Sequence, residues 1–353
     1  MTKAAPWYAP WLGPEGLSAA GWGAVAGAAT AAFLVLLVVP FLQRFAWWTA
    51  FLDHPEARKL HTKATPLLGG VAVALGMAGG FAIGSLVGRL DLPRPWPWWG
   101  LGAAAALLLG LYDDRFGMGP GRKLVFQTVI GLLFLAGGIF PQPFGPAPGF
   151  LLSLLWITGL MNAVNFLDNM DGIVGGMSAI LATGLGVLLF SWGRHPEALV
   201  AFCLAAACLA FLRYNFSPAS IFLGDAGSLF LGYSLATLSL VAAHAGVGVQ
   251  ASAAALLILG YPVFDICFVI VRRLREGRKI YQGGKDHTTH RLNRLVRGPR
   301  RTAAWVYFFA ASLTWTGVAL ANAQGLPQVL LWLSAWALWL LLLGLRLARI
   351  PAQ

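Results

Sequence analysis

A dense group of acidic and amide side chains lies at residues 162–171, between apolar segments long enough to lie in a membrane. It contains three carboxamides and two carboxylates, and the four candidate site residues among them are Asn162, Asn165, Asp168 and Asp171. An ionised side chain at bilayer depth is costly, so such acids usually face water, a cation or a substrate. Asn and Asp together can read the edge of a nucleobase or bind a metal through oxygen. The alternative is a cluster that only caps a helix end.

The spacing of these four residues does not place them on one helical face. Asp168 and Asp171 are three positions apart and can share a face, whereas Asn162 lies on the opposite side from Asp171 on an ideal helix. Glycines follow at 172, 175 and 176 and leave space around the backbone. We therefore expect the end of a helix and the loop that follows it.

A second acidic site contains the adjacent residues Asp113 and Asp114. Neighbouring carboxylates repel each other unless a cation or a basic group neutralises them, so the pair indicates a Mg²⁺ site or an acid that transfers protons. A solvated turn is the alternative. Asp225 lies between glycines just before another apolar run. Taken alone, it is equally well explained as a helix N-cap.

The first basic loop, residues 53–70, contains Lys63 and ends in a Gly-Gly pair. Basic side chains near a bilayer attract phosphate groups, and the glycines would let the backbone approach a ligand closely. The alternative is a charge cluster that only sets membrane topology.

The second basic loop, residues 272–301, contains His287 and His290 beside Asp286. These side chains can bind phosphate or relay a proton. Zinc is not expected, because the loop has no cysteine. A basic loop that only faces lipid headgroups is the alternative. Asp265 lies inside the apolar run before this loop, and a structural ion pair and a catalytic role are equally open for it.

Composition places all these residues in a membrane protein. Of the 353 residues, 58% are hydrophobic and 11% are charged, with a mean hydropathy of +0.71, whereas a soluble domain has about 25% charged residues. The apolar runs match the roughly 20 residues that a helix needs to cross a bilayer, and the alternation expected of barrel strands is absent. The sequence predicts an all-α polytopic helix bundle, with one integral membrane domain over residues 1–353 and a basic cytoplasmic loop at 272–301 within it.

Eleven transmembrane helices are predicted from the apolar runs. They cover residues 18–40, 67–88, 97–112, 123–140, 149–165, 173–192, 196–212, 226–243, 249–271, 302–322 and 326–346. With the N-terminus outside and the C-terminus cytoplasmic, 21 of the 25 basic residues lie inside, and the exceptions are Lys3, Arg89, Arg94 and Arg194. Most acids lie on the same inner side. This topology and anionic lipid explain the net charge of +12, so no nucleic acid is expected as a partner.

Taken in order, the five motifs resemble those of the polyprenyl-phosphate N-acetylhexosamine-1-phosphate transferases, a membrane superfamily that includes the phospho-MurNAc-pentapeptide translocases. The resemblance runs from about Asp53 to Arg294. It implies a multi-pass enzyme of the bacterial inner membrane that transfers a sugar 1-phosphate from a UDP-sugar to a polyprenyl phosphate and releases UMP at the cytoplasmic face. It also implies a Mg²⁺ cofactor, for which Mn²⁺ is a possible substitute, and a possible homodimer.

The resemblance assigns roles to individual positions. Three residues are identified as catalytic: Asp113, Asp114 and His287. Six are identified as substrate-binding: Lys63, Asn165, Asp168, Asp171, His290 and Arg291. Two are identified as metal ligands: Asp114 and Asp225.

Two segments favour the GlcNAc-1-phosphate branch of this superfamily. The segments Pro262-Val-Phe-Asp265 and Asp286-His-Thr-Thr-His-Arg291 resemble that branch, whereas the pentapeptide translocases usually carry adjacent histidines where this chain has Thr289. We therefore expect transfer of GlcNAc-1-phosphate for cell-envelope polysaccharide synthesis. Transfer of phospho-MurNAc-pentapeptide in peptidoglycan synthesis is the alternative. A membrane transporter is a more distant one, because the acids gather at one face and not at the midplane.

Overall fold

The computed structural model describes residues 12–13, 16–54, 64–92, 96–141, 144–246, 248–281, 284–321, 323 and 325–350. Within these residues the helices are α1 (Ala19–Trp48), α2 (Gly69–Gly88), α3 (Trp96–Phe116), α4 (Pro120–Leu135), α5 (Pro146–Leu167), α6 (Ile173–Ser191), α7 (His195–Asn215), α8 (Gly224–Ala245), α9 (Gly248–Ile258), α10 (Gly260–Arg275), α11 (Thr288–Val296), α12 (Pro299–Leu320) and α13 (Leu326–Ala348). Two short antiparallel strand pairs join β1 (Leu12–Gly13) to β2 (Gly16–Leu17) and β3 (Leu52–Asp53) to β4 (Thr65–Pro66). The predicted all-helical membrane fold is confirmed.

The helices that match the predicted spans are not equally suited to crossing a membrane. In the described part of the chain, eight are long and apolar enough: α1, α2, α5, α6, α7, α8, α12 and α13. A bent pair, α9 and α10, counts as a ninth if the two form one span. The helices α3 and α4, at the predicted third and fourth spans, are outside this set. The number of eleven crossings therefore stays a prediction.

The predicted ninth span, residues 249–271, is not one straight helix. The helices α9 and α10 are bent by 68° at Leu259. Pro262 explains the break, because proline has no amide hydrogen to donate to the carbonyl four residues earlier and its ring crowds that carbonyl. The carbonyl in question, of Ile258, lies 3.4 Å from the Oγ1 donor of Thr314 on α12.

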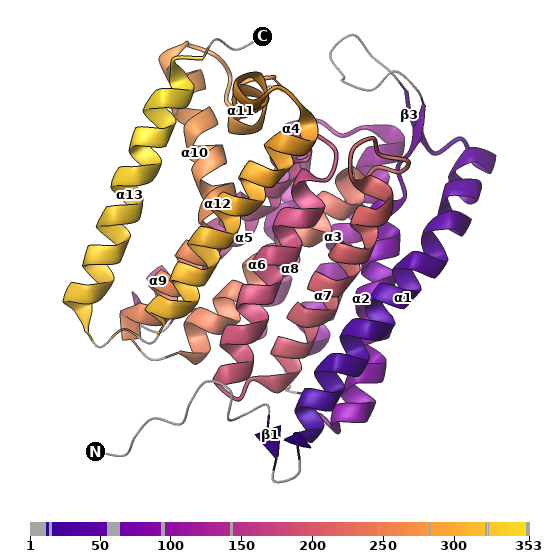
Figure 1. Cartoon of the computed structure of the whole chain (residues 1–353), viewed down its shortest axis with the longest axis vertical. Helices are drawn as coiled ribbons and strands as arrows, with labels where there is room; N and C mark the ends of the chain where they lie inside the picture. Colours follow the sequence, from indigo (N-terminus) through magenta and orange to yellow (C-terminus); the bar gives the residue numbers. More distant parts are fainter. Residues whose placement is uncertain are drawn as a thin grey trace.

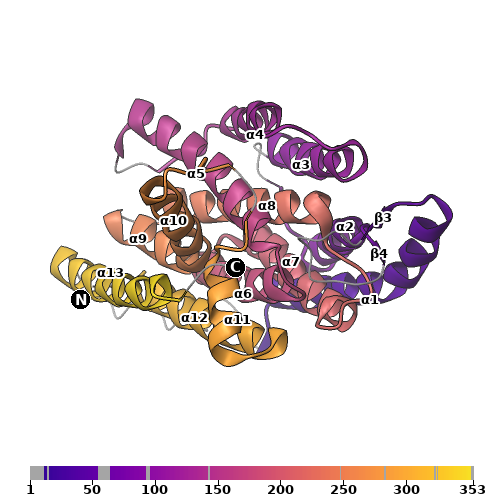
Figure 2. The same ribbon diagram turned by 90° about the horizontal axis from the view of Figure 1, so that it is seen from above.

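Helix α8 forms the centre of the bundle and α13 lies at its edge. The most apolar 18 residues of α8 are 100% buried, whereas those of α13 are 6% buried. Seen from above in Figure 2, α8 lies in the middle, with α1 and α13 toward opposite sides. Glycines bring α2 against α8, since a Cβ on Gly70 would lie 2.2 Å from the backbone nitrogen of Gly227. This close approach fixes the N-terminal turn of α8, which carries Asp225.

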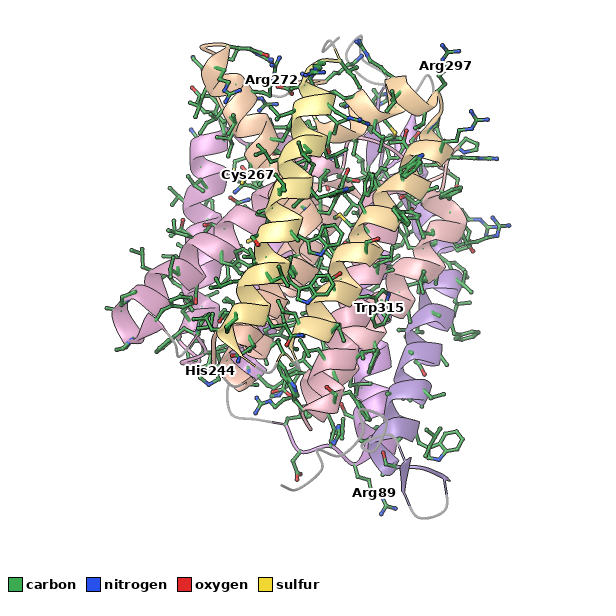
Figure 3. All side chains as sticks on the ribbon, turned by 60° about the vertical axis from the view of Figure 1, so that its left-hand side comes forward. Arg89, His244, Cys267, Arg272, Arg297 and Trp315 are labelled. Carbon is green, nitrogen blue, oxygen red and sulfur yellow. The ribbon has the colours of Figure 1, made fainter. Side chains whose placement is uncertain are left out.

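The two ends of the bundle carry different elements. Strand β1 lies at one end, and β3 and α11 lie at the other (Figure 1). Arg272 and Arg297 lie at the α11 end, while Arg89 and His244 lie at the opposite end (Figure 3). Helix α11 lies within the predicted basic loop 272–301 and was not expected from the sequence.

Candidate active site

Lys123 is the centre of a cluster of acidic and amide side chains. Its Nζ lies 2.8 Å from Asp113 Oδ2, 2.7 Å from Asp225 Oδ2 and 3.1 Å from Asn165 Oδ1. Lys123 comes from the first turns of α4, and its partners come from the ends of α3, α8 and α5. The Asp225 side chain is 34% exposed, against 8% for Asp113, so Asp225 is the more accessible of the two acids. We call these four residues the Lys123 cluster.

Asn165 joins Asp225 to the rest of the Lys123 cluster. Its Nδ2 donates to Asp225 Oδ1 at 2.6 Å and to Ser228 Oγ at 2.8 Å, while its Oδ1 accepts from Lys123. A carboxamide has both donors and an acceptor, so it can bridge a carboxylate and an ammonium group. Asn162 lies one turn earlier on α5 and donates to Gln127 Oε1 on α4 at 2.7 Å. Asn162 therefore holds α5 against α4 and is not a member of the cluster.

Asp114 caps the N-terminus of α8. Its Oδ1 accepts from the backbone nitrogen of Asp225 at 2.8 Å, and its Oδ2 accepts from that of Ala226 at 3.0 Å. A carboxylate at this place satisfies amides that have no partner within the helix and complements the helix dipole. Gly224 makes the contact possible, because its φ is +73° and a Cβ there would lie 2.6 Å from Asp114 Oδ2. The two adjacent acids thus have different partners.

Asp168 and Asp171 lie in the connection between α5 and α6. Asp171 Oδ2 accepts from the backbone nitrogen of Ala219 at 3.0 Å, which fastens this connection to the one between α7 and α8. Asp168 ends α5, and burial, together with the charges of Asp225 and Asp114, raises its pKa well above the usual value. Asp171 therefore fixes the connection between α5 and α6, whereas the surroundings of Asp168 favour the protonated form of its carboxyl group.

His287 packs beside the end of α5 that carries Asn165. Its ring lies edge-on to Phe166 with centroids 6.0 Å apart, and its Nδ1 lies 2.8 Å from Asp265 Oδ2 on α10. The ring of His290 lies 6.4 Å from that of His287. Burial and the neighbouring His287 lower the pKa of His290 to about 4, so His290 is neutral at pH 7.

Two arginines hold the basic loop in place. Arg273 donates to both carboxylate oxygens of Asp286, at 2.8 Å and 2.7 Å, and both side chains are buried. Burial alone would raise the pKa of Asp286, but the Arg273 guanidinium lowers it to about 2. Arg291 is also buried and donates to the carbonyl oxygens of Leu347 and Ile350 at the end of α13. The structure therefore places Arg291 between the loop and α13, not in the Lys123 cluster.

Thr289 links the basic loop to the connection after α5. Its Oγ1 donates to Asn169 Oδ1 at 2.8 Å, and Thr289 is fully buried. Asn169 directly follows Asp168 in the chain. Thr289, at a position where the pentapeptide translocases usually have histidine, therefore joins two loops of the site.

The Lys123 cluster and its surroundings bring together residues from three of the five predicted motifs. Asp113, Asp225 and Asn165 share Lys123, while Asp114 binds the backbone beside Asp225. Lys63 lies outside the described residues. Lys123 was not predicted as a site residue. The sequence did place Lys123 in a basic pair shortly after Asp113-Asp114, which could have marked it as a candidate. Spacing alone, however, does not show with which acid a lysine forms an ion pair.

The oxygen atoms around Lys123 are of the kinds that bind Mg²⁺ in proteins. Among the described residues, no three His, Cys, Asp or Glu side chains are grouped so as to hold a metal ion. Two carboxylates and one amide oxygen nevertheless converge on a single cation, the Lys123 ammonium. Carboxylate and amide oxygens are hard ligands that suit Mg²⁺. The donor set therefore fits a divalent cation if the ammonium moves aside.

Comparison with known proteins identifies similar chains. Residues 96–243 match the family described as glycosyl transferase family 4, and this segment contains every member of the Lys123 cluster. Over 323 residues the chain is 29% identical to a probable undecaprenyl-phosphate N-acetylglucosaminyl 1-phosphate transferase of Bacillus subtilis, covering 89% of this chain and 87% of that protein.

Two further relatives come from other bacteria. A decaprenyl-phosphate N-acetylglucosaminephosphotransferase of Mycobacterium tuberculosis is 29% identical over 331 residues, which cover 83% of this chain and 80% of the relative. An undecaprenyl-phosphate alpha-N-acetylglucosaminyl 1-phosphate transferase of Escherichia coli is 27% identical over 305 residues, which cover 82% of this chain and 81% of the relative. The similarity thus extends over most of each chain.

Proposed function

We infer that this chain, which belongs to the polyprenyl-phosphate N-acetylhexosamine-1-phosphate transferase superfamily, transfers GlcNAc-1-phosphate from UDP-GlcNAc to a polyprenyl phosphate and releases UMP. The names of the relatives from three bacteria support the reaction. The structural observation that carries the proposal is the Lys123 cluster, in which Asp113, Asp225 and Asn165 surround one cation inside the segment matched to the family. The product would serve cell-envelope polysaccharide synthesis.

The reaction needs positioning and charge neutralisation more than covalent chemistry by the protein. An oxygen of the lipid phosphate attacks the sugar-bearing phosphorus of UDP-GlcNAc. The bond from that phosphorus to the bridging oxygen breaks, and UMP leaves with the electron pair. Because both reactants are anions, a cationic Lys123 side chain at the meeting point lowers their repulsion. Asp113 orients Lys123 and can accept the proton of a lipid phosphate that arrives protonated.

We propose Mg²⁺ as the cofactor, with Mn²⁺ able to replace it. Asp225 would be its main ligand, because this carboxylate is the more exposed acid of the Lys123 cluster. Asp114, predicted as a second ligand, would act chiefly by holding the α8 N-terminus and thereby Asp225, since both its oxygens accept backbone hydrogen bonds. A bound divalent cation would neutralise phosphate oxygens and make phosphorus more electrophilic.

The uridine would lie against the connection after α5. Asp168 offers a carboxyl oxygen there to the N–H of the base, and Asn165, whose amide hydrogens already bond Asp225 and Ser228, offers only its oxygen. Asp171 would shape this pocket through its bond to the α7–α8 connection. His287 and the neutral His290 would bind the diphosphate and the sugar, and Lys63 would bind phosphate. Arg291 would hold in place the loop that carries the two histidines.

We propose that the chain crosses the bacterial inner membrane eleven times, with the N-terminus outside and the active site on the cytoplasmic face. The gathering of Arg272 and Arg297 at the α11 end supports this orientation (Figure 3). In that arrangement the bent pair α9 and α10 forms the ninth crossing, and α3 and α4 form the third and fourth. A homodimer is compatible with the exposed apolar surface of α13.

The decisive experiment measures UMP release from purified protein. With UDP-GlcNAc, undecaprenyl phosphate and Mg²⁺, we expect UMP and a pyrophosphate-linked lipid, and EDTA should abolish both. UDP-MurNAc-pentapeptide in place of UDP-GlcNAc tests the alternative donor. An Asp225→Asn variant that folds normally controls for contaminating enzymes. No UMP from any UDP-aminosugar, or equal turnover by Asp225→Asn, would refute the proposal.

A further inference from the structure

Asp265 is a completely buried carboxylate, and both of its oxygens have hydrogen-bond partners in the basic loop. Its Oδ2 lies 2.8 Å from His287 Nδ1, and its Oδ1 accepts from the backbone nitrogen and Oγ1 of Thr288, at 2.8 Å and 2.5 Å. Tyr261, one turn earlier on α10, contacts the same Thr288 hydroxyl at 3.1 Å. Three donors therefore converge on one acid from two adjacent residues of the loop. An acid buried without such partners would be costly.

These contacts decide which ring nitrogen of His287 carries the proton. An ionised carboxylate only accepts hydrogen bonds, so Nδ1 must be the protonated nitrogen that donates to Asp265. Among the described residues, Nε2 of His287 has no hydrogen-bond partner. Phe166 packs edge-on against the ring and limits its rotation. Asp265 and Phe166 thus fix the orientation of the imidazole, and Nε2 remains available to a ligand.

We propose that Asp265 is a positioning residue for the sugar-1-phosphate transfer, which fixes the orientation and tautomer of His287 so that the unprotonated Nε2 accepts a hydrogen bond from a hydroxyl group of the bound UDP-sugar. This inference rests on the proposed function. Asp265 itself touches no substrate.

A purely structural role is the competing explanation. The Arg273–Asp286 pair shows that this loop does use buried ion pairs for anchoring. The two explanations differ in what happens to the histidine ring. An Asn at 265 can keep its oxygen toward Thr288, but its amide group would then donate to Nδ1 and move the ring proton to Nε2. The fold would be kept while the tautomer is reversed.

The test compares Asp265→Asn with Thr288→Val, a control that removes one donor to Asp265 but leaves the His287 contact in place. We expect Asp265→Asn to lower kcat by about 10-fold or more, because removing a partner that orients an imidazole costs from about 10-fold at metal-bound histidines to about 10,000-fold in catalytic triads, with KM for UDP-GlcNAc changed less than about threefold. Thr288→Val should keep most of the activity. Asp265→Glu should restore part of the loss, because it returns a carboxylate acceptor.

A double-mutant cycle supplies the readout that a structural role would not move. In a His287→Ala background, Asp265→Asn should cause little further loss, because its effect acts through the imidazole. Equal losses with and without His287, or normal kcat for Asp265→Asn, would overturn the proposal.

Nitrogen-15 NMR of labelled histidine tests the same point without turnover. The His287 resonances are those missing from His287→Gln. They should show a protonated Nδ1 in the wild type and a shift of the proton toward Nε2 in Asp265→Asn, and an unchanged pattern would contradict the proposal. If the wild type releases no UMP, the transferase function fails while this measurement still decides the Asp265–His287 pairing.

Discussion

Replacing Lys123 by methionine removes the positive charge at the centre of the site and keeps the length of the side chain. Lys123 Nζ contacts two carboxylate oxygens, at 2.7 Å and 2.8 Å. With an effective dielectric constant near 20, each contact corresponds to about 6 kcal/mol of attraction before desolvation is subtracted. Removing one partner of a buried ion pair costs about 3–5 kcal/mol net.

The expected loss of activity has a separate origin, because the ion-pair figure concerns folding stability. Removing one group that stabilises charge in a transition state costs about 100- to 1000-fold in rate, so Lys123→Met should lower kcat/KM by about 100-fold or more if the ammonium has that role. The same substitution leaves Asp113 and Asp225 unneutralised, so Mg²⁺ should bind more tightly and raise the thermal midpoint more than in the wild type.

The assay is UMP release across a Mg²⁺ titration, with thermal unfolding of the same samples. Lys279→Met is the matched control, because Lys279 is an exposed lysine of the basic loop that packs over Tyr281. It should retain wild-type turnover. Activity of Lys123→Met within about threefold of the wild type, together with an unchanged Mg²⁺ dependence, would refute the reasoning, since it would mean that the ammonium neither aids transfer nor competes with the metal.

The remaining predictions concern stability. Gly224→Ala should destabilise the protein by about 1–3 kcal/mol, because alanine is strained at a φ of +73° and its Cβ would press on Asp114. The control is Gly117→Ala, which has the backbone strain of a φ of +70° but open space around the new Cβ. An equal loss of stability in both variants would argue against the contact with Asp114. The pKa of Asp286 is lowered from 3.8 to about 2 by Arg273 despite burial, so its contribution of about 2 kcal/mol is complete above pH 4 and disappears as the pH falls through 2. In detergent, the stability advantage of wild type over Asp286→Asn should shrink over that window, whereas Glu276→Gln, in an exposed ion pair, should show little pH-dependent difference. A constant advantage of the wild type down to pH 2 would contradict this assignment.

The sequence by itself determined the helical membrane architecture and the residue types of the site. Runs of apolar residues are a local property, and only a helix satisfies its own backbone hydrogen bonds within a bilayer. The break between α9 and α10 was also available from the sequence, because Pro262 stands inside the apolar run. The concentration of acids in Asp113-Asp114 and in residues 162–171 could be seen directly, since charged side chains are rare in such a chain.

The tertiary structure decided which partner each of these side chains has. Lys123 and Asp225 are 102 positions apart, and Asp265 and His287 are separated by a helix end and a loop. Two adjacent acids, Asp113 and Asp114, meet an ammonium group and a helix N-terminus respectively, although their sequence context is nearly the same.

Such differences arise because a side chain's partner depends on the direction in which its helix presents it and on which other helix ends lie there. Residue spacing gives the direction of a side chain only relative to its own segment. Which helix ends lie near that side chain depends on the packing of α3, α4, α5 and α8 against one another, which small residues such as Gly70 and Gly224 permit. Ion pairs within hydrogen-bonding distance therefore follow from the packed bundle, and the sequence alone predicts only which groups are available to form them.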